Sequence, residues 1–305
     1  MQVYNYGKII SDGDDRMSYG AQTMAEPIKR VIMRRPGESL KQADPAKWHY
    51  GPTFDAARAI EQYAAFADMV AASGAEILWF EDTGDGLADA MFTHDPSLAT
   101  VHGAILLNMG KPLRRDEVAG HEAVYTAAGV PILGRLSGDA TVEGGDCVWV
   151  DEKTLVVGRG VRSNAEGIAQ LRDILAPYGV EVLSFDLPLW QGEEACLHLM
   201  SVISPLADKL ALVYAPLLPA PFYQLLKARG YTLIEAPEDE FMASNGLNLN
   251  VLPLKPNDVV AVAGFDNTKA LMEEAGCRVQ TFAADALCIA CEGGPTCLTR
   301  PIWRG

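Results

Sequence analysis

The feature that most constrains this chain is a succession of strand and helix signals that occurs five times. Each unit has a short apolar run typical of a strand, then apolar residues at helical spacing, then a glycine that ends the helix, then a second strand. The sequence predicts helices over 54–73, 117–128, 165–178, 221–228 and 268–275. It predicts the first strands over 30–33, 105–107, 154–158, 210–214 and 259–262, and the second strands over 76–80, 129–133, 179–183, 230–234 and 276–280.

The glycines that end the five helices give this repeat its period. They are Gly74, Gly129, Gly179, Gly230 and Gly276, at intervals of 55, 50, 51 and 46 residues. A regular interval with one helix per unit is typical of a repeat architecture. We therefore expect an α/β fold in which five units close into a ring, with helices outside and strands around a central cavity. An ordinary α/β sheet whose units have similar lengths is the alternative.

Polar residues interrupt apolar surroundings at one phase of the repeat. They are Asp95, Glu143, His198, Asn248 and Cys297, at intervals of 48, 55, 50 and 49 residues. Each has an ordinary explanation by itself, since an aspartate before a proline forms turns and a histidine in an apolar run is often a core residue. In a ring, however, the five side chains would converge on one axis and face a shared pocket.

The last of these residues, Cys297, lies in a turn. Two glycines and a proline precede it (Gly293, Gly294 and Pro295), and these cannot continue a helix or a central strand. A thiol there is either a small buried hydrophobe or a nucleophile that a base from elsewhere in the chain activates.

Of the other five cysteines, Cys288 and Cys291 form a C-x-x-C pair. A single pair without a second pair or nearby histidines makes a poor zinc site, and thioredoxin-type context is missing. Cys147, Cys196 and Cys277 are predicted to be core residues of apolar strands.

Composition excludes some function classes. A net charge of −15 argues against nucleic acid as a partner, because little here could neutralise a run of phosphates. We find no apolar signal region and no uninterrupted apolar run of about 18 residues, so we predict a cytoplasmic protein that does not enter a membrane. Residues 1–29 read as a polar lead-in and residues 30–305 as a single catalytic domain.

Four motifs in order carry a family resemblance. FTHDP at 92–96, EGGD at 143–146, CLHL at 196–199 and GGPTCLTRP at 293–301 resemble the guanidine-modifying superfamily of arginine deiminases, dimethylarginine dimethylaminohydrolases and amidinotransferases. The resemblance covers nearly the whole chain from about Arg30. It implies the pentein fold, which is a five-bladed α/β propeller with pseudo-fivefold repeats around a central active site.

Within the superfamily, the motifs are most similar to those of dimethylarginine dimethylaminohydrolase. Met200 stands where arginine deiminases usually carry an aspartate that binds the guanidinium group, and an apolar residue suits methylated nitrogens better. The stretch 160–164 (GVRSN) is similar to that family's arginine-threonine-asparagine segment, although Ser163 replaces the threonine. His94, which precedes the motif aspartate, is a further departure from the family pattern.

The resemblance implies a role for each site residue. Cys297 is expected to attack the guanidinium carbon, His198 to donate and accept protons, and Glu143 and Asp95 to bind the planar cation. Residues expected to contact the rest of the substrate, in addition to Asp95, are Arg114, Arg115, Arg162, Asp146 and Asn248, with Asp146 either orienting the site or binding the α-amino group.

The expected reaction converts a methylated arginine to citrulline and an amine through a covalent S-alkylthiouronium intermediate. It requires no cofactor and no metal, and the partner is a small guanidino molecule; a homodimer is compatible with this assignment. The alternatives on the same scaffold are arginine deimination, amidino transfer and hydrolysis of another guanidino compound. An alternative from a different class is a non-catalytic ligand-binding or metal-binding module.

Overall fold

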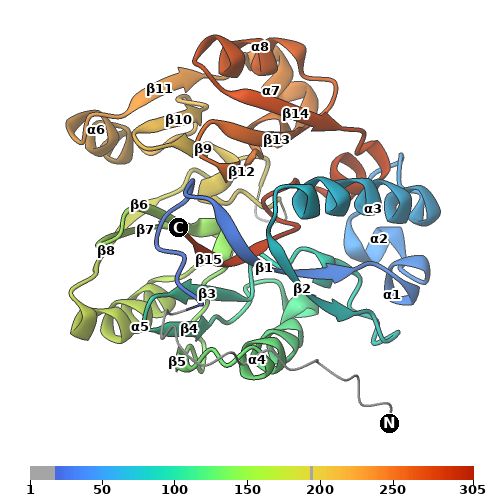
Figure 1. Ribbon diagram of the computed structural model, residues 1–305, viewed down its shortest axis with the longest axis horizontal. Helices are drawn as coiled ribbons and strands as arrows, with labels where there is room; N and C mark the ends of the chain where they lie inside the picture. The colour runs from blue at the N-terminus through green and yellow to red at the C-terminus, as the bar shows by residue number, and fades with distance from the viewer. Residues whose placement is uncertain (1–17, 193–194) are drawn as a thin grey trace.

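The computed structural model describes residues 18–192 and 195–305, and these contain five separate three-stranded sheets (Figure 1). The first sheet comprises β1 (Ile28–Arg35), β2 (Glu76–Glu81) and β15 (Arg300–Arg304). The second comprises β3 (Ser97–Thr100), β4 (Gly103–Leu106) and β5 (Ile132–Arg135), and the third β6 (Cys147–Asp151), β7 (Thr154–Arg159) and β8 (Glu181–Asp186). The fourth comprises β9 (Ile203–Ala207), β10 (Leu210–Val213) and β11 (Thr232–Glu235), and the fifth β12 (Leu252–Lys255), β13 (Asp258–Val262) and β14 (Arg278–Phe282).

All five sheets have the same topology. The central strand pairs antiparallel with one neighbour and parallel with the strand that follows it through a helical crossover. In four sheets the antiparallel neighbour directly precedes the central strand in the chain. In the first sheet it is β15, so the C-terminal strand completes the sheet that the N-terminal strand begins. The turn that carries Cys297 therefore precedes a strand equivalent to β3, β6, β9 and β12.

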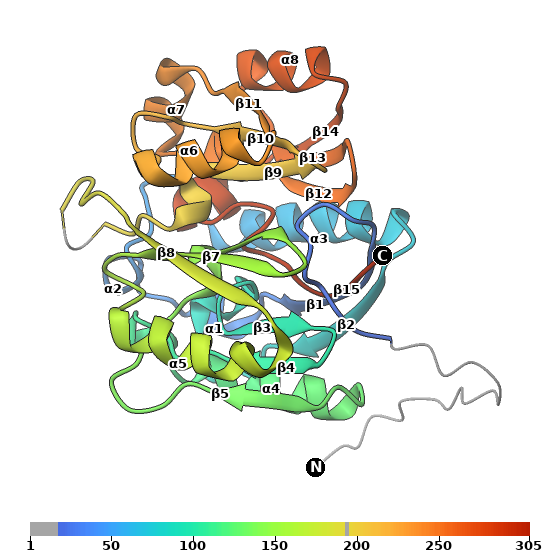
Figure 2. The same ribbon diagram turned by 90° about the vertical axis from the view of Figure 1, so that its left-hand side faces the viewer.

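The crossover helices are α3 (Ala56–Ala72), α4 (Glu117–Ala127), α5 (Ala165–Leu175), α6 (Ala220–Ala228) and α8 (Asp266–Glu274). They lie toward the periphery, whereas the strands lie toward the middle (Figures 1 and 2). Shorter helices are α1 (Glu38–Lys41), α2 (Pro45–Trp48) and α7 (Glu238–Ser244), and a single π-helical turn spans Asp285–Ile289. No helix within 18–192 or 195–305 is both long and apolar enough to span a bilayer.

The predicted helices and strands are all present, with small shifts at their ends. For example, α3 begins at Ala56 because the carboxylate of Asp55 accepts a hydrogen bond from the backbone N–H of Arg58 at 2.9 Å, which caps the helix. The mixed α/β class is confirmed. The antiparallel third strand of each sheet was not predicted, because it has only four or five residues and no alternation of its own.

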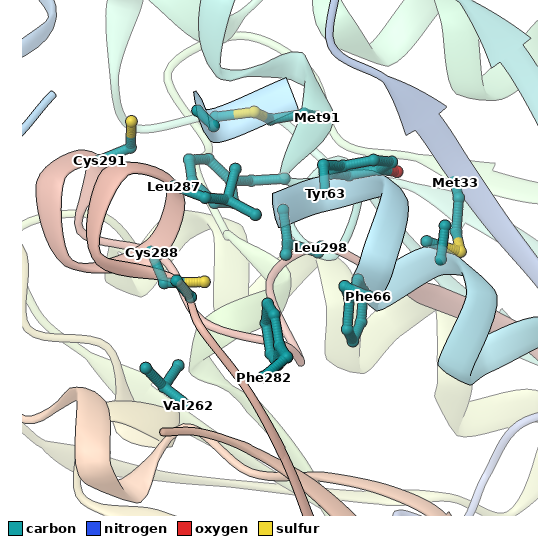
Figure 3. Close-up of a cluster of buried hydrophobic side chains, with 14 of the residues drawn as sticks. Met33, Tyr63, Phe66, Met91, Val262, Phe282, Leu287, Cys288, Cys291 and Leu298 are labelled. Atoms are coloured by element: carbon teal, nitrogen blue, oxygen red, sulfur yellow. The ribbon is translucent and has the colours of Figure 1, made fainter. Parts of the chain in front are cut away.

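The cysteine turn is anchored in a large apolar cluster that includes α3 and the π-helical turn (Figure 3). Phe66 stacks on Phe282 with ring centroids 5.1 Å apart, and Tyr63, Leu287 and Leu298 fill the space around them. Burial of each such side chain contributes roughly 1.5–3 kcal/mol. Leu298 directly follows Cys297, so this packing fixes the backbone that carries the thiol.

Part of the predicted lead-in is also ordered within the fold. Gly20 forms a bridge to Trp303 of β15, and its N–H donates to the carbonyl oxygen of Ile302 at 2.7 Å. β1 begins at Ile28, two residues before the predicted strand. Residues 1–17 of the lead-in lie outside the described residues.

Candidate active site

The turns that precede the antiparallel strands border one cavity of about 110 Å³. Its wall takes residues from every repeat unit. The residues that line it are Trp48, His49, Asp89, Phe92, Asp95, Lys111, Arg114, Arg162, Cys196, His198, Ser201, Asn245, Gly246, Leu247, Asn250, Cys291, Glu292, Gly293 and Cys297. Cys297 and His198 therefore face the same space, although 99 residues separate them in the chain.

Cys297 is held by the side chain of Asn250. The amide nitrogen of Asn250 donates a hydrogen bond to Sγ of Cys297 at 3.0 Å, and the amide oxygen accepts one from the N–H of Thr296 at 2.9 Å. Gly294 allows this approach, since a Cβ there would lie 2.4 Å from Cγ of Asn250. Burial and the Asp95 carboxylate raise the pKa of the thiol above its ordinary value, whereas the hydrogen bond from Asn250 acts in the opposite direction.

His198 and Glu143 form the second element of the site. Nε2 of His198 lies 2.7 Å from Oε2 of Glu143, whose side chain is fully buried. Oε1 of Glu143 accepts from the N–H of Lys111 at 3.0 Å, and Arg162 Nη1 lies 3.2 Å from Oε2. Burial favours the neutral carboxyl, but the hydrogen bond from His198, its charge and the Arg162 charge outweigh burial and lower the pKa of Glu143 to about 2.

The groups around Glu143 also change the pKa of the His198 imidazole. Burial disfavours the imidazolium, but Cys196, Asp146 and the Glu143 carboxylate together raise the pKa of His198 well above its ordinary value. Because Glu143 lies in contact with Nε2, we regard the carboxylate as the dominant source of this increase. At neutral pH the cavity wall therefore holds a carboxylate–imidazolium pair.

Asp95 is a buried carboxylate with both oxygens hydrogen-bonded. Oδ1 accepts from the N–H of Gly145 at 2.9 Å, and Oδ2 accepts from Nη1 of Arg114 at 2.7 Å. The pKa of Asp95 lies well below its ordinary range. Burial by itself would raise this pKa, but the positive charges of Arg114 and His198 lower it by a larger amount. Each carboxylate oxygen has two lone pairs, so Asp95 retains acceptors that can face the cavity.

Arg114 lines the cavity, but most of its N–H donors are bound within the protein. Its guanidinium contacts Asp95, the carbonyl oxygen of Phe92 at 2.9 Å and the carboxylate of Glu117 at 2.9 Å, and the side chain is buried. Its contact with Asp95 positions that carboxylate, and the expectation that Arg114 binds substrate stays a prediction. Arg115 is exposed and does not line the cavity, so the expectation that it binds substrate is corrected.

Asp146 lies behind the cavity wall. Its buried carboxylate accepts from the hydroxyl of Ser163 at 2.6 Å and from the N–H of Leu199 at 2.9 Å. Burial raises its pKa to about 6. These contacts connect the segments that carry Glu143, Arg162 and His198, so of the two expected roles for Asp146, orientation of the site fits this placement.

Asn248 and Met200 lie elsewhere. The amide of Asn248 is hydrogen-bonded to Ser244 and Thr268, and the side chain lines a different pocket, so the expectation that it binds substrate is wrong. Asn250, two residues later, reaches the thiol instead.

Met200 borders a second cavity that shares no lining residue with the first, so it does not face the position where a guanidinium would contact Cys297.

Sequence reasoning also misplaced one cysteine. Cys147 lies in β6 and Cys277 just before β14, and both are buried as predicted. Cys196 lies in no strand, is half-buried and lines the cavity beside His198. Its place two residues before a site histidine is the signal that could have identified it, because alternate residues of an extended segment share a side.

The C-x-x-C cysteines do not form a joint site. Cys288 and Cys291 are both buried free thiols, and their side chains point in different directions (Figure 3). Neither belongs to a cluster of three or more potential metal ligands among the described residues. Cys291 borders the cavity, whereas Cys288 packs in the core.

Comparison with known proteins identifies the class of this fold and site. The family model for arginine deiminase matches residues 84–220 and 215–304. The chain belongs to the arginine deiminase family, and with it to the guanidine-modifying enzymes, which confirms the resemblance read from the four motifs.

Among relatives, dimethylarginine dimethylaminohydrolase from Streptomyces coelicolor is 30% identical over 64% of this chain and 72% of its own length. The enzyme of that name from Pseudomonas aeruginosa is 28% identical over 83% of this chain and 91% of its own length.

Solved structures of this class share the fold. A cysteine-to-serine mutant of Pseudomonas aeruginosa dimethylarginine dimethylaminohydrolase, in complex with citrulline, superposes with a TM-score of 0.73 at 23% identity, covering 90% of this chain and 99% of the other. SxtG, an amidinotransferase from Microseira wollei, gives a TM-score of 0.75 at 16% identity, covering 94% and 97%. At these identities the superpositions establish the fold alone.

Proposed function

We propose that this protein is a hydrolase that acts on the guanidinium carbon of a methylated arginine and releases citrulline and a methylamine. The observation that carries the proposal is the convergence of Cys297, the Glu143–His198 pair and Asp95 on one cavity. This set provides a nucleophile, a proton donor and acceptors for a planar cation. Two relatives that bear the name dimethylarginine dimethylaminohydrolase support this choice of substrate.

In the first step the thiolate of Cys297 attacks the guanidinium carbon, and the substituted amine leaves with a proton from His198. This attack forms a C–S bond, and the C–N bond to the departing amine then breaks. The product of the step is an S-alkylthiouronium intermediate. The raised pKa of the free thiol implies that the thiolate forms when the cationic substrate arrives beside it.

In the second step a water molecule attacks the same carbon, and His198 accepts its proton. The C–S bond then breaks and regenerates Cys297, and the former guanidinium carbon becomes the ureido carbon of citrulline. Glu143 contributes by holding the imidazole at 2.7 Å in the orientation that both proton transfers use.

Arg162 is proposed to bind the carboxylate of the substrate. Its guanidinium borders the cavity, and its contacts with Glu143 at 3.2 and 3.4 Å use only Nη1. An arginine has five N–H donors, so the three on Nε and Nη2 remain for a ligand. Asn164 supports this loop by capping α5 with a hydrogen bond from Gly167 N–H at 2.8 Å.

We infer further that the five sheets are the blades of a propeller whose axis passes through the site. Their common topology, the closure of the first sheet by β15 and the contribution of every unit to one cavity support this arrangement.

The deciding experiment is product analysis with asymmetric dimethylarginine, monomethylarginine and arginine as separate substrates. We expect citrulline with stoichiometric dimethylamine from asymmetric dimethylarginine and stoichiometric methylamine from monomethylarginine, and no turnover by Cys297→Ser. Release of ammonia from arginine at comparable kcat/KM would instead identify an arginine deiminase. Transfer of the amidino group to an added amine, without formation of citrulline, would identify an amidinotransferase.

A further inference from the structure

The second cavity, which Met200 borders, lies directly behind the floor of the candidate active site. Its volume is about 20 Å³, and a volume of roughly 10–15 Å³ is enough for one water-sized particle. Its wall includes His94, which precedes Asp95 in the chain, and Thr296, which precedes Cys297. At these two positions the backbone itself forms the partition between the two cavities.

Two arginines make the wall of the second cavity positively charged. Arg300 and Arg304 both line it, and Arg300 is only 5% exposed. The guanidinium group of Arg300 donates to the backbone carbonyl oxygen of His94. Arg304 donates to the backbone carbonyl oxygens of Glu26 and Pro253, the latter at 3.1 Å. Within 18–192 and 195–305, neither guanidinium group is hydrogen-bonded to a carboxylate.

The two cations also act on each other. Burial and the nearby charge of Arg300 lower the pKa of Arg304 to about 9, whereas a carboxylate in contact would raise it. Burial lowers the pKa of Arg300 below its ordinary value as well. An uncompensated buried charge is unfavourable, so a counter-ion bound beside the two guanidinium groups would stabilise the folded protein.

Polar atoms without a partner gather at the same cavity. Five buried side-chain nitrogen or oxygen atoms of the described residues have no hydrogen-bond partner, and three of them belong to residues that line this cavity. These are Nε of Arg300, Oγ1 of Thr23 and Nε2 of His94. The Nε–H group and the hydroxyl are donors that a ligand can use.

The histidine takes a different part. Nδ1 of His94 lies 2.9 Å from the carbonyl oxygen of Thr299, which can only accept a hydrogen bond. Nδ1 therefore carries the proton of the neutral ring, and Nε2 is an acceptor that adds no donor to the cavity. The donors available to a ligand are those of the two arginines and of Thr23.

We propose that the second cavity binds one small monoatomic anion, such as chloride, through Arg300, Arg304 and Thr23. Such an ion accepts hydrogen bonds from Nε of Arg300 and from the Thr23 hydroxyl, and it supplies the negative charge that faces both guanidinium groups. The small volume and the apolar remainder of the wall, which includes Met24 and Leu98, select against a polyatomic anion such as phosphate. The site is independent of the proposed hydrolysis.

The first test measures urea unfolding of the full chain at constant ionic strength, with chloride replacing gluconate, which is too large for the cavity. A ligand that binds only the folded state stabilises it in proportion to the logarithm of its concentration above Kd, so the wild-type midpoint should rise with chloride. The apparent Kd should be weaker by about 10–100-fold in Arg304→Met and by about 10-fold in Thr23→Val, because each loses a donor to the ion.

Arg278→Met is the matched control. It changes the net charge as Arg304→Met does, but Arg278 is exposed, is paired with Asp258 and does not line the cavity. Its chloride dependence, measured against its own chloride-free midpoint, should equal that of the wild type. Thr23→Val keeps the shape of the side chain, so it tests the site even if Arg304→Met folds poorly.

A crystal grown in sodium bromide then locates the ion. An anomalous peak should lie in the second cavity of the wild type and be missing in Thr23→Val or Arg304→Met. The proposal is overturned if chloride gives no stabilisation beyond that of gluconate, or if the wild type and Arg304→Met respond equally. Bromide found only elsewhere, with water alone in the cavity, overturns it too. None of these results bears on the hydrolase assignment, because no step of the test measures turnover.

Discussion

Asn250 donates a hydrogen bond to the sulfur of Cys297 at 3.0 Å, while the same side chain accepts from the N–H of Thr296. One amide thus holds both the thiol and the backbone beside it. It supplies a donor to a sulfur that burial and Asp95 otherwise keep protonated. This relationship makes Asn250 the group that sets the reactivity of the proposed nucleophile.

We expect Asn250→Ala to raise the pKa of Cys297 further, because the thiolate loses its hydrogen-bond donor. The rate of alkylation by iodoacetamide as a function of pH would show this as a shift to higher pH, and kcat/KM should fall by about 10–100-fold. Cys297→Ser identifies the part of the alkylation that belongs to this thiol. An unchanged alkylation profile in Asn250→Ala would contradict the role assigned to the amide.

Gly145→Ala should displace the imidazole of His198. An added Cβ would lie 2.5 Å from its Nδ1, which is closer than real Cβ contacts allow. We expect a loss of kcat on the order of 100-fold, with a decrease in the free energy of unfolding of about 1–3 kcal/mol. Gly51→Ala is the matched control, since its nearest neighbour would be the Ala290 carbonyl oxygen at 3.6 Å. Steady-state kinetics and urea unfolding of both variants separate the two effects, and full activity in Gly145→Ala would refute the placement of the ring.

Asp146→Ala should impair both stability and catalysis. It leaves the hydroxyl of Ser163 and the N–H of Leu199 without their buried acceptor, which costs about 2–4 kcal/mol for the two groups together. If Asp146 acts through the orientation of His198, kcat should fall more than KM rises, because no ligand contact is removed. A rise in KM with unchanged kcat would instead support direct binding of the substrate's α-amino group.

The contribution of two buried histidines to stability should be lost as the pH falls below about 6.5. Burial, together with the charge of Arg300, lowers the pKa of the buried His121 to about 3, and the same causes act on His94. Between pH 3 and 6.5 each of these histidines is protonated in the unfolded chain and neutral in the folded one, so each costs roughly 2 kcal/mol at pH 5 relative to pH 7. Glu117 and Asp146, whose pKa values burial raises to about 7 and about 6, act in the opposite direction, so the histidine contribution is measured by urea unfolding of a histidine variant beside the wild type at both pH values.

The variant His121→Gln should reduce that difference between pH 7 and pH 5 by about 2 kcal/mol. His102→Gln serves as the control, because His102 is exposed and should leave the difference unchanged. Equal pH dependence in the wild type and His121→Gln would show that His121 does not remain neutral in the fold.

The sequence by itself determined the repeat, the class of fold and four members of the site. Periodicity located the five helices because apolar spacing and glycine stops are local properties of the chain. The phase of the polar turns predicted that Asp95, Glu143, His198 and Cys297 come together: three of them line one cavity, and Glu143 is hydrogen-bonded to His198.

Only the tertiary structure decided which neighbours of these residues reach the cavity. Asn250 rather than Asn248 contacts the thiol, Arg114 is already bound by Asp95 and Glu117, and Cys196 lies beside His198. Each outcome depends on side-chain direction and on hydrogen-bond partners far away in the chain. A shift of one or two residues leaves the periodicity of the sequence nearly unchanged, but it turns a side chain from the cavity into the core.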